Sequence, residues 1–253
     1  MKHLPLLAVL IFTFPHIALS DEASPIEFHV VHYPPYEIIH PSGDIAGIDV
    51  EVARAAFEAV DIPIVVKTAP WKRILKNIEY GRIAGTITCS KRPGRETYIH
   101  YSDPISNAQQ VIFSALETPV SSLKKFSDIA NYTVTVVDGW GIQKELEHAD
   151  IAHLPTLDVS SGINAIVYRD VELFYNGFLT TQYQARVMGL ENKIKATFLE
   201  DQGKTDFHIC FSKAYPDYKL LTQRFNEGLA LIKANGVFED IYHRYLKTTV
   251  GLR

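Results

Sequence analysis

The chain has 253 residues, of which 47% are hydrophobic and 21% charged, and its formal net charge is −4. This composition is typical of a globular protein and excludes a disordered or collagen-like chain. The slight negative charge argues against a nucleic-acid partner, which a basic surface would bind. Its two cysteines, Cys89 and Cys210, are too few for a disulfide-dense scaffold or a four-cysteine zinc site. The length allows one large domain or two small ones.

The first twenty residues have the layout of a secretory signal peptide. Lys2 gives a positive start, an apolar run extends over 4–14, and residues 18–20 fit the small-x-small cleavage pattern. The apolar run is shorter than the roughly 20 residues that span a membrane, and Pro15 and His16 end it. We therefore expect cleavage after about Ser20 and export to a bacterial periplasm, with a membrane anchor as the alternative.

Strand and helix patterns alternate through the first part of the mature chain. Runs of β-branched residues predict strands, and apolar residues three to four apart predict helices. The expected order is strand 28–31, helix 49–60, strand 62–67, helix 71–80 and strand 83–88. Such alternation favours parallel strands in an α/β layer architecture.

The same alternation restarts further along the chain. Strands are expected at 111–114, 132–137, 171–175 and 207–211, with a helical turn at 127–130 and helices at 142–148, 216–234 and 237–246. No sequence repeat and no low-complexity linker separates the two halves. The sequence therefore predicts two α/β units without a long flexible connection.

The most specific pattern lies in residues 81–104, which read GRIAGTITCSKRPGRETYIHYSDP. A predicted strand ends there in small polar residues, an arginine comes next, and Tyr-Ser-Asp-Pro begins six residues after it. The segment resembles the family 3 extracellular solute-binding proteins, the periplasmic proteins of polar amino-acid uptake. Their pattern at this place is Ser/Thr-x-Thr-x-x-Arg followed by Phe-Ser-x-Pro.

Four further segments resemble the same family in the same order. The opening YPPYEIIHPSGDIAGIDVEVARAAF resembles its Tyr-Pro-Pro-Phe and Gly-Phe-Asp-Val motifs, and TAPWKRILKNIEYGRI resembles its Trp-led helix. YTVTVVDGWG resembles its second-lobe loop, and FNEGLALIKANGVFEDIYHRYL resembles its closing helices. Each segment alone is a weak signal, but together they cover nearly all of residues 26–247.

The resemblance implies a two-lobed α/β fold of the periplasmic-binding-protein type II. Two mixed sheets flanked by helices would be joined by two crossovers that form a hinge. Lobe 1 would comprise residues 21–106 and 213–253, and lobe 2 would comprise residues 111–207. A ligand would bind in the cleft between the lobes, which close over it.

Arg95 is the first candidate for ligand binding, because a planar guanidinium can hold a carboxylate through two parallel charge-assisted hydrogen bonds. Arg92 lies close in sequence, but the spacing to Tyr-Ser-Asp-Pro favours Arg95, with a solvated loop arginine as the alternative. Thr88 and Ser90 precede Arg95 at positions where the family presents hydroxyl and backbone groups to the ligand. Ordinary polarity at a strand end is the alternative for both.

Three aromatic residues are expected to form walls of the cleft. Tyr33 and Tyr36 flank a Pro-Pro loop, and Trp71 stands at a predicted helix start. A ring face attracts an ammonium group and covers an aliphatic stem. Burial in the core is the alternative for each of them.

Two candidates in the second half depart from the family pattern. Trp140 stands where the family usually has Thr or Ser, beside backbone N–H groups that could bind an anion. Its indole would narrow the cleft or stack on a ring-bearing ligand. Asn176 falls where the family often has an aspartate that binds the α-ammonium of the ligand. A neutral amide loses that ion pair, which puts an α-amino acid ligand in doubt.

No metal or cofactor is expected. The histidine pairs His29 with His32 and His148 with His153 do not supply the three or four ligands of a zinc site. The sequence also lacks a nucleophile elbow, a phosphate loop and a dinucleotide-binding fingerprint.

We therefore expect a monomeric periplasmic binding protein without catalysis and without a nucleic-acid partner. It would capture a small polar, carboxylate-bearing, amino-acid-like ligand and deliver it to an inner-membrane ABC permease or a sensor. The alternatives are a dehydratase resembling cyclohexadienyl dehydratase and a stand-alone sensory lobe that serves a separate signalling partner. An oxidising periplasm allows a Cys89–Cys210 disulfide, but two free buried thiols remain an equal alternative.

Overall fold

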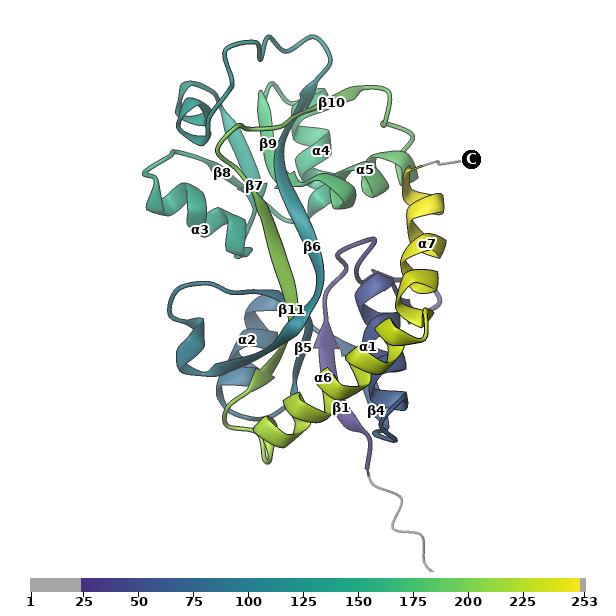
Figure 1. Cartoon of the computed structure of the whole chain (residues 1–253). Helices are drawn as coiled ribbons and strands as arrows, with labels where there is room; N and C mark the ends of the chain where they lie inside the picture. The colour runs from purple at the N-terminus through teal and green to yellow at the C-terminus, as the bar shows by residue number, and fades with distance from the viewer. Residues whose placement is uncertain (1–23, 251–253) are drawn as a thin grey trace, which may run out of the picture.

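The computed structural model of the chain describes residues 24–250 and has an elongated shape with two ends of mixed helix and strand (Figure 1). The predicted signal peptide lies outside the described residues. Within them, nine strands form one sheet, eight of them in the order β4-β1-β5-β11-β6-β9-β7-β8, while β10 lies off this path and pairs with β6. None of the described helices is long and apolar enough to cross a membrane.

The lower end in Figure 1, which we call lobe 1, is built around three parallel strands. Helix α1 connects the first of these strands to the second, and α2 connects the second to the third, as the alternating sequence pattern predicts. The elements are β1 (Ile26–Val30), α1 (Ile48–Glu58), β4 (Ile64–Thr68), α2 (Trp71–Glu79), β5 (Gly85–Ser90) and the 3-10 turn η1 (Arg95–Thr97). A small hairpin of β2 (Ile38–Ile39) and β3 (Ile45–Ala46) precedes α1.

Two long antiparallel strands connect lobe 1 to the upper end, which we call lobe 2. The chain leaves lobe 1 along β6 (Ile99–Ala115) and returns along β11 (Lys204–Ser212), and the two strands pair with each other between the lobes (Figure 1). The register between them shifts on either side of His208.

Lobe 2 repeats the arrangement of helices around strands. Its elements are η2 (Phe126–Asn131), β7 (Val134–Val137), α3 (Gly141–His148), β8 (Leu154–Thr156), α4 (Val159–Tyr168), β9 (Leu173–Gly177), α5 (Phe178–Val187) and β10 (Ile194–Thr197). The chain then closes in α6 (Tyr218–Ala234) and α7 (Val237–Val250). Both helices lie along lobe 1, and α7 reaches up to α5 of lobe 2 (Figure 1).

Each lobe has its own hydrophobic core. In lobe 1, rings from β1, α1, β11 and α6 form one cluster of Phe28, Phe57, Phe211 and Phe225, and α2 covers a second cluster. In lobe 2, one cluster lies under α3 and another under α4 and α5. Separate cores allow the lobes to move as units about the strands that join them.

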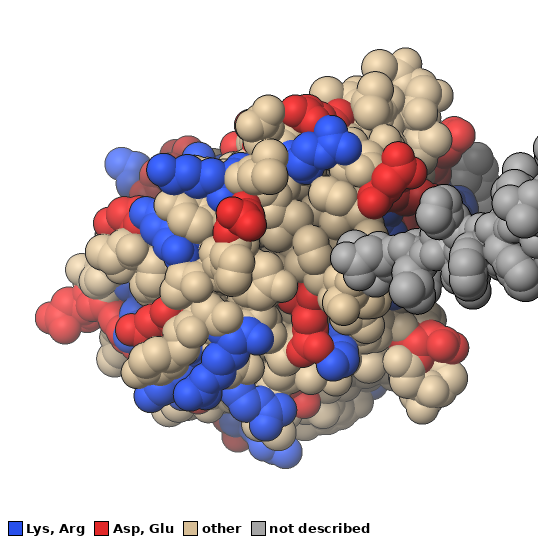
Figure 2. Space-filling model, turned by 90° about the horizontal axis from the view of Figure 1, so that it is seen from below, with Lys and Arg blue, Asp and Glu red and all other residues tan. Residues whose placement is uncertain are grey.

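The fold class predicted from the sequence is confirmed. One detail differs, because the two expected sheets share β6 and are therefore joined in a single path. The expected strand at 111–114 is the end of this much longer strand. Seen from below in Figure 2, acidic and basic side chains are interspersed over lobe 1.

Cys89 and Cys210 form a disulfide between neighbouring strands β5 and β11, with their Cα atoms 5.9 Å apart. Both residues are buried, at 2% and 0% exposure. Of the two possibilities that the sequence left open, the structure contains the disulfide.

Candidate functional site

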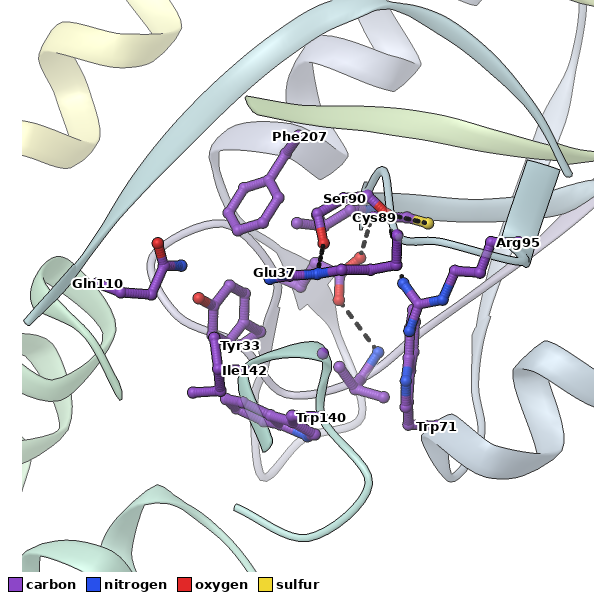
Figure 3. A pocket seen from close by; sticks show the side chains of 14 residues that line it. Tyr33, Glu37, Trp71, Cys89, Ser90, Arg95, Gln110, Trp140, Ile142 and Phe207 are labelled. Carbon is purple, nitrogen blue, oxygen red and sulfur yellow. Dashed lines mark hydrogen bonds between the residues drawn. The ribbon is translucent and has the colours of Figure 1, made fainter. Parts of the chain in front are cut away.

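A cavity of about 70 Å³ lies between the lobes, beside the strands that join them. Its lining comes from both lobes, and Figure 3 shows the side chains converging on it. The lining residues are Val31, Tyr33, Glu37, Trp71, Thr88, Cys89, Ser90, Arg92, Arg95, Gln110, Trp140, Gly141, Ile142 and Phe207. Six of the eight predicted site residues are among them, namely Tyr33, Trp71, Thr88, Ser90, Arg95 and Trp140.

Arg95 begins η1 directly after Gly94, whose φ of 84° lies in the left-handed region that glycine adopts readily. One terminal nitrogen donates to the carbonyl of Ser90 at 3.3 Å, and the guanidinium lies 5.3 Å from the ring centroid of Trp71. Burial lowers the pKa of Arg95 from its usual value, but the group remains a cation. Among the described residues, no carboxylate pairs with it.

Arg92 also lines the cavity but has partners of its own. Its Nε donates to the Ser90 hydroxyl at 3.1 Å, and a terminal nitrogen forms an ion pair with Glu145 on α3 of lobe 2. The Tyr175 hydroxyl donates to the other carboxylate oxygen of Glu145 at 2.5 Å. Arg92 therefore links the lobes, while Arg95 keeps donors available to a ligand.

Trp140 precedes α3 and forms the lobe 2 wall of the cavity. Its ring meets Tyr33 of lobe 1 edge to face, with centroids 5.0 Å apart. The neighbouring Gly139 N–H, which the sequence offered as part of an anion site, donates to the side chain of Gln143 at 2.6 Å. Trp140 thus narrows the cleft, as its size predicts.

Beyond Trp140 the cleft continues into a second cavity of about 530 Å³. The two cavities share Val31, Trp71 and Trp140 as lining residues. At this outer part of the cleft, Lys72 of lobe 1 forms a 2.8 Å ion pair with Asp138 of lobe 2.

Tyr36 and Asn176 are not among the cavity-lining residues. Tyr36 is 2% exposed behind Tyr33, which stacks on it with centroids 5.4 Å apart, and its hydroxyl donates to the Asn107 carbonyl at 2.8 Å. Asn176 is fully buried on β9, where its amide donates to the Thr181 hydroxyl at 3.0 Å. Tyr36 is therefore buried in the core, which was the alternative to a position in the cleft wall.

Tyr33 separates the Asn176 region from the cavity. Its hydroxyl approaches Gly177 so closely that a Cβ on that residue would lie 2.8 Å from the oxygen. The side chain crosses from lobe 1 into the space beside β9 that a ligand would need in order to reach Asn176. Neither Tyr36 nor Asn176 lines the cavity in this arrangement.

Two buried carboxyl groups lie behind the cavity and were not singled out by the sequence. Glu37 lines the cavity, and its two oxygens accept from the backbone N–H groups of Val31 and Thr88, each at 3.1 Å. Asp49 accepts from the hydroxyls of Thr88 and Ser106, each at 2.9 Å. Burial raises the pKa of Glu37 to about 8 and that of Asp49 to about 7.

Thr88 therefore donates to Glu37 through its backbone N–H and to Asp49 through its hydroxyl. Gln110 and Phe207, which the sequence also did not single out, come from the two long connecting strands β6 and β11. No local motif marks them. Their place in a hinge strand beside the predicted crossovers is the one signal that could have suggested them.

Within residues 24–250, no group of three or more His, Cys, Asp or Glu side chains could hold a metal ion. The cavity is instead lined by aromatic rings, two guanidinium groups and few other polar groups. Such an arrangement suits a small organic anion, because charge-assisted hydrogen bonds strengthen where water is excluded.

The family model for bacterial extracellular solute-binding proteins, family 3, matches residues 29–248, and the chain belongs to this family. The chain is similar to the ABC transporter arginine-binding protein 1 of Escherichia coli (strain K12), with 25% identity. That match covers 95% of this chain and 97% of the relative.

Solved structures share the fold at lower identity. A histidine kinase sensor domain with similarity to periplasmic binding proteins has a TM-score of 0.77 and 18% identity, covering 89% of this chain and 96% of that one. The arginine-, lysine-, histidine-binding protein ArtJ from Geobacillus stearothermophilus has a TM-score of 0.75 and 16% identity, covering 89% and 98%. An ancestral amino-acid-binding protein, described as a precursor of cyclohexadienyl dehydratase, has a TM-score of 0.72 and 15% identity, covering 87% and 94%.

Proposed function

We propose that this solute-binding protein captures a small organic carboxylate in the cavity between its lobes. The observation that carries the proposal is Arg95, a half-buried cation that faces the cavity and has no acidic partner among the described residues. A charge removed from water needs a counter-ion, and a ligand carboxylate would supply it. The ring of Trp71 holds the guanidinium plane in place for bidentate binding.

In this proposal the ligand is bound and released rather than transformed. Residues 21–106 with 213–253 move as lobe 1 and residues 111–207 as lobe 2, about the strands β6 and β11. The protein is exported to the periplasm with loss of about 20 residues and acts as a monomer. It delivers its ligand to an ABC permease or presents it to a sensor, as members of an extracellular binding family would.

A dehydratase is the second candidate, because one observation favours it. Glu37 lines the cavity, and with a pKa raised to about 8 its carboxyl carries a proton at neutral pH. A protonated carboxyl in a cleft can act as a general acid. Its oxygens are held by backbone N–H groups, which makes it less available to a leaving group than a free side chain.

A thermal-shift screen of the chain from residue 21 tests the proposal. The panel contains small carboxylates, amino acids, amines and prephenate, and every compound that raises the melting temperature is then measured by calorimetry. We expect carboxylates to stabilise the protein and amines without a carboxylate to leave it unchanged. Formation of phenylpyruvate from prephenate would support the dehydratase instead.

Arg95→Gln should weaken the binding of a carboxylate found in the screen by about 10- to 150-fold, since hydrogen bonds between charged groups contribute roughly 1.5–3 kcal/mol. Arg169→Gln, which removes the same charge from an exposed position at the end of α4, should bind like the wild type. Equal affinity of the Arg95 variant and the wild type would refute the site assignment.

A further inference from the structure

We propose that the ligand is an organic acid without an ammonium group that carries a further oxygen acceptor beside its carboxylate, as a 2-oxo acid does. This inference rests on the proposed function and specifies the ligand class of the same cavity. The hydrogen-bonding groups of the lining residues support it, because the side chains with capacity left are donors, while the Glu37 carboxyl and the Gln110 amide oxygen already accept hydrogen bonds.

Arg95 is the first donor with capacity to spare. A guanidinium has five N–H groups, and the hydrogen bond to the Ser90 carbonyl at 3.3 Å uses one of them. Its plane lies over Trp71, and in Figure 3 its terminal nitrogens point toward the space between Trp71 and Glu37. A ligand carboxylate bound there would receive two parallel hydrogen bonds.

The indole N–H of Trp71 is the second donor. This nitrogen is buried and has no hydrogen-bond partner within the part of the chain that the structure describes, although Trp71 lines the cavity. Leaving a buried donor without a partner is unfavourable, and an acceptor on the ligand would remove that cost. An ammonium group could not satisfy it, since both groups donate.

Gln110 is the third donor. Its side-chain oxygen accepts from the Thr205 hydroxyl at 3.1 Å, so the amide NH₂ is the end left for a ligand. Gln110 lies on β6 opposite Gly177 of β9, at the far side of the cavity from Arg95. Figure 3 shows its nitrogen directed toward the lining residues rather than away from them. The cavity therefore offers donors at both ends.

Among the described residues, the cavity lining offers no free carboxylate to an ammonium group. Glu37 is its one carboxyl, and both oxygens of Glu37 already accept from backbone N–H groups. Burial raises the pKa of Glu37 to about 8, so at neutral pH the group is mostly uncharged. Glu145 is paired with Arg92 and Tyr175, and Asn176 lies behind Tyr33.

The body of the ligand lies between rings. Trp71 of lobe 1 and Trp140 of lobe 2 stand on two sides of the cavity, and Tyr33 and Phe207 close it further in (Figure 3). Flat walls of this kind bury planar groups with little loss of conformational entropy. Aryl 2-oxo acids such as phenylpyruvate combine a planar body, a carboxylate and an adjacent carbonyl acceptor.

Matched pairs of compounds test the inference by calorimetry on the wild-type protein. The pairs are phenylpyruvate with L-phenylalanine and 2-oxoglutarate with L-glutamate, and every carboxylate found in the screen is compared with its 2-amino counterpart. We expect the member without the ammonium group to bind at least about tenfold more tightly. If the amino acid of a pair binds as tightly or more tightly, the inference is overturned while the proposed function stands. If no carboxylate binds at all, the proposed function itself fails.

An isosteric variant adds a second readout. Gln110→Glu replaces the donor end of the amide with a carboxylate oxygen and should shift the preference within each pair toward the amino acid. Gln109→Glu is the control, because it makes the same charge change at the neighbouring position of β6. An unchanged preference in Gln110→Glu, measured on protein with wild-type circular dichroism, would overturn the role of Gln110.

Discussion

Two carboxyl groups, those of Glu37 and Asp49, have pKa values raised by burial, and they lie 1% and 0% exposed behind the cavity. Neither carboxyl has a basic partner among the described residues, and each instead accepts from backbone N–H or hydroxyl groups. Burial without an opposite charge penalises the ionised form and raises the pKa of both groups. Folding therefore takes up protons at neutral pH, since the unfolded chain ionises these groups near pH 4.

Because folding takes up protons, the protein should become less stable as the pH rises. The unfolded state binds fewer protons than the native state between the unfolded pKa values near 4 and the folded values of about 7 for Asp49 and 8 for Glu37. The free energy of unfolding should therefore fall as the pH rises through this window, by roughly 1 kcal/mol per pH unit for each group. Urea unfolding at pH 6, 7 and 8 measures the slope.

Asp49→Asn is the matched control for that slope. The hydroxyls of Thr88 and Ser106 can rotate to accept from an amide, so the variant keeps these contacts without an ionisable group. It should lose less stability than the wild type between pH 6 and pH 8. A wild type whose stability rises over this range would contradict the raised pKa values.

At the residue scale, the sequence predicted those site residues that lie together in one short motif. Arg95 and Ser90 stand within one short segment before a recognisable Tyr-Ser-Asp-Pro sequence, and the structure places both in the cavity lining. Glu37 reaches the cavity from the loop before β2 and Gln110 from β6, 73 residues further on, and no short motif encodes this tertiary arrangement. Asn176 was aligned to a family position, but the ring of Tyr33 in front of it is a tertiary contact.

At the scale of the elements, two cationic side chains of lobe 1 lie against the start of α3 and the turn before it. A Cβ on Gly139 would lie 2.7 Å from the Lys72 side chain, and a Cβ on Gly141 would lie 2.8 Å from Nε of Arg92. Each cation pairs with an acid of lobe 2 at that place, Asp138 and Glu145 respectively. The two glycines therefore let the lobes approach each other.

Gly141→Ala should separate lobe closure from stability. Gly141 is the first residue of α3 and does not have a positive φ, so alanine costs no backbone strain there and favours the helix. The added methyl displaces the Arg92 guanidinium from Ser90 and Glu145 when the lobes close. We expect an unchanged or slightly higher melting temperature without ligand, and ligand affinity lowered about tenfold.

Gly203→Ala provides the control, because a Cβ there has open space and the residue lacks a positive φ. It should leave both the affinity and the small-angle scattering radius unchanged. Gly141→Ala should increase that radius if it favours an open cleft. Wild-type affinity in Gly141→Ala would show that closure does not require the close approach of Arg92.

Elements with a regular hydrophobic period were predictable, and others were not. The amphipathic spacing of Val52 and Ala56 predicted α1, and the β-branched run at 132–137 predicted β7. Helices α4 (Val159–Tyr168) and α5 (Phe178–Val187) were not predicted. The first has two serines and a glycine in its opening turn, and the second contains β-branched threonines, all residues of low helix propensity. Packing against the sheet of lobe 2 stabilises both despite that propensity.

At the scale of the whole molecule, the lobes are in direct contact across the cleft. Two ion pairs and the contact between Tyr33 and Trp140 join them. The Lys72–Asp138 pair is largely exposed and contributes little, whereas Arg92 and Glu145 are mostly buried. Contacts between the lobes therefore stabilise the closed arrangement in addition to any contacts with a ligand.

The disulfide closes the chain of lobe 2 into a covalent loop. Cys89 stands at the end of β5, where the chain is about to leave lobe 1, and Cys210 stands on β11, where it returns. The bond spans 121 residues and thereby encloses all of lobe 2. In the chain-entropy model, closing a loop of this length stabilises the folded state by about 4–5 kcal/mol, because it restricts the unfolded chain.

Reduction of the disulfide should therefore lower the stability of the entire protein and not of lobe 1 alone. Both sulfur-bearing residues are buried, so a reductant reaches the bond when the protein unfolds, and urea unfolding with and without dithiothreitol measures the full effect. The midpoint should move to lower urea concentration in the wild type by an amount equal to about 4–5 kcal/mol divided by the slope of the transition. The double variant Cys89→Ala/Cys210→Ala should unfold identically with and without the reductant. If the reductant left the wild-type midpoint unchanged, the two strands would not be covalently joined. Strand pairing and packing alone would then hold lobe 2 to lobe 1.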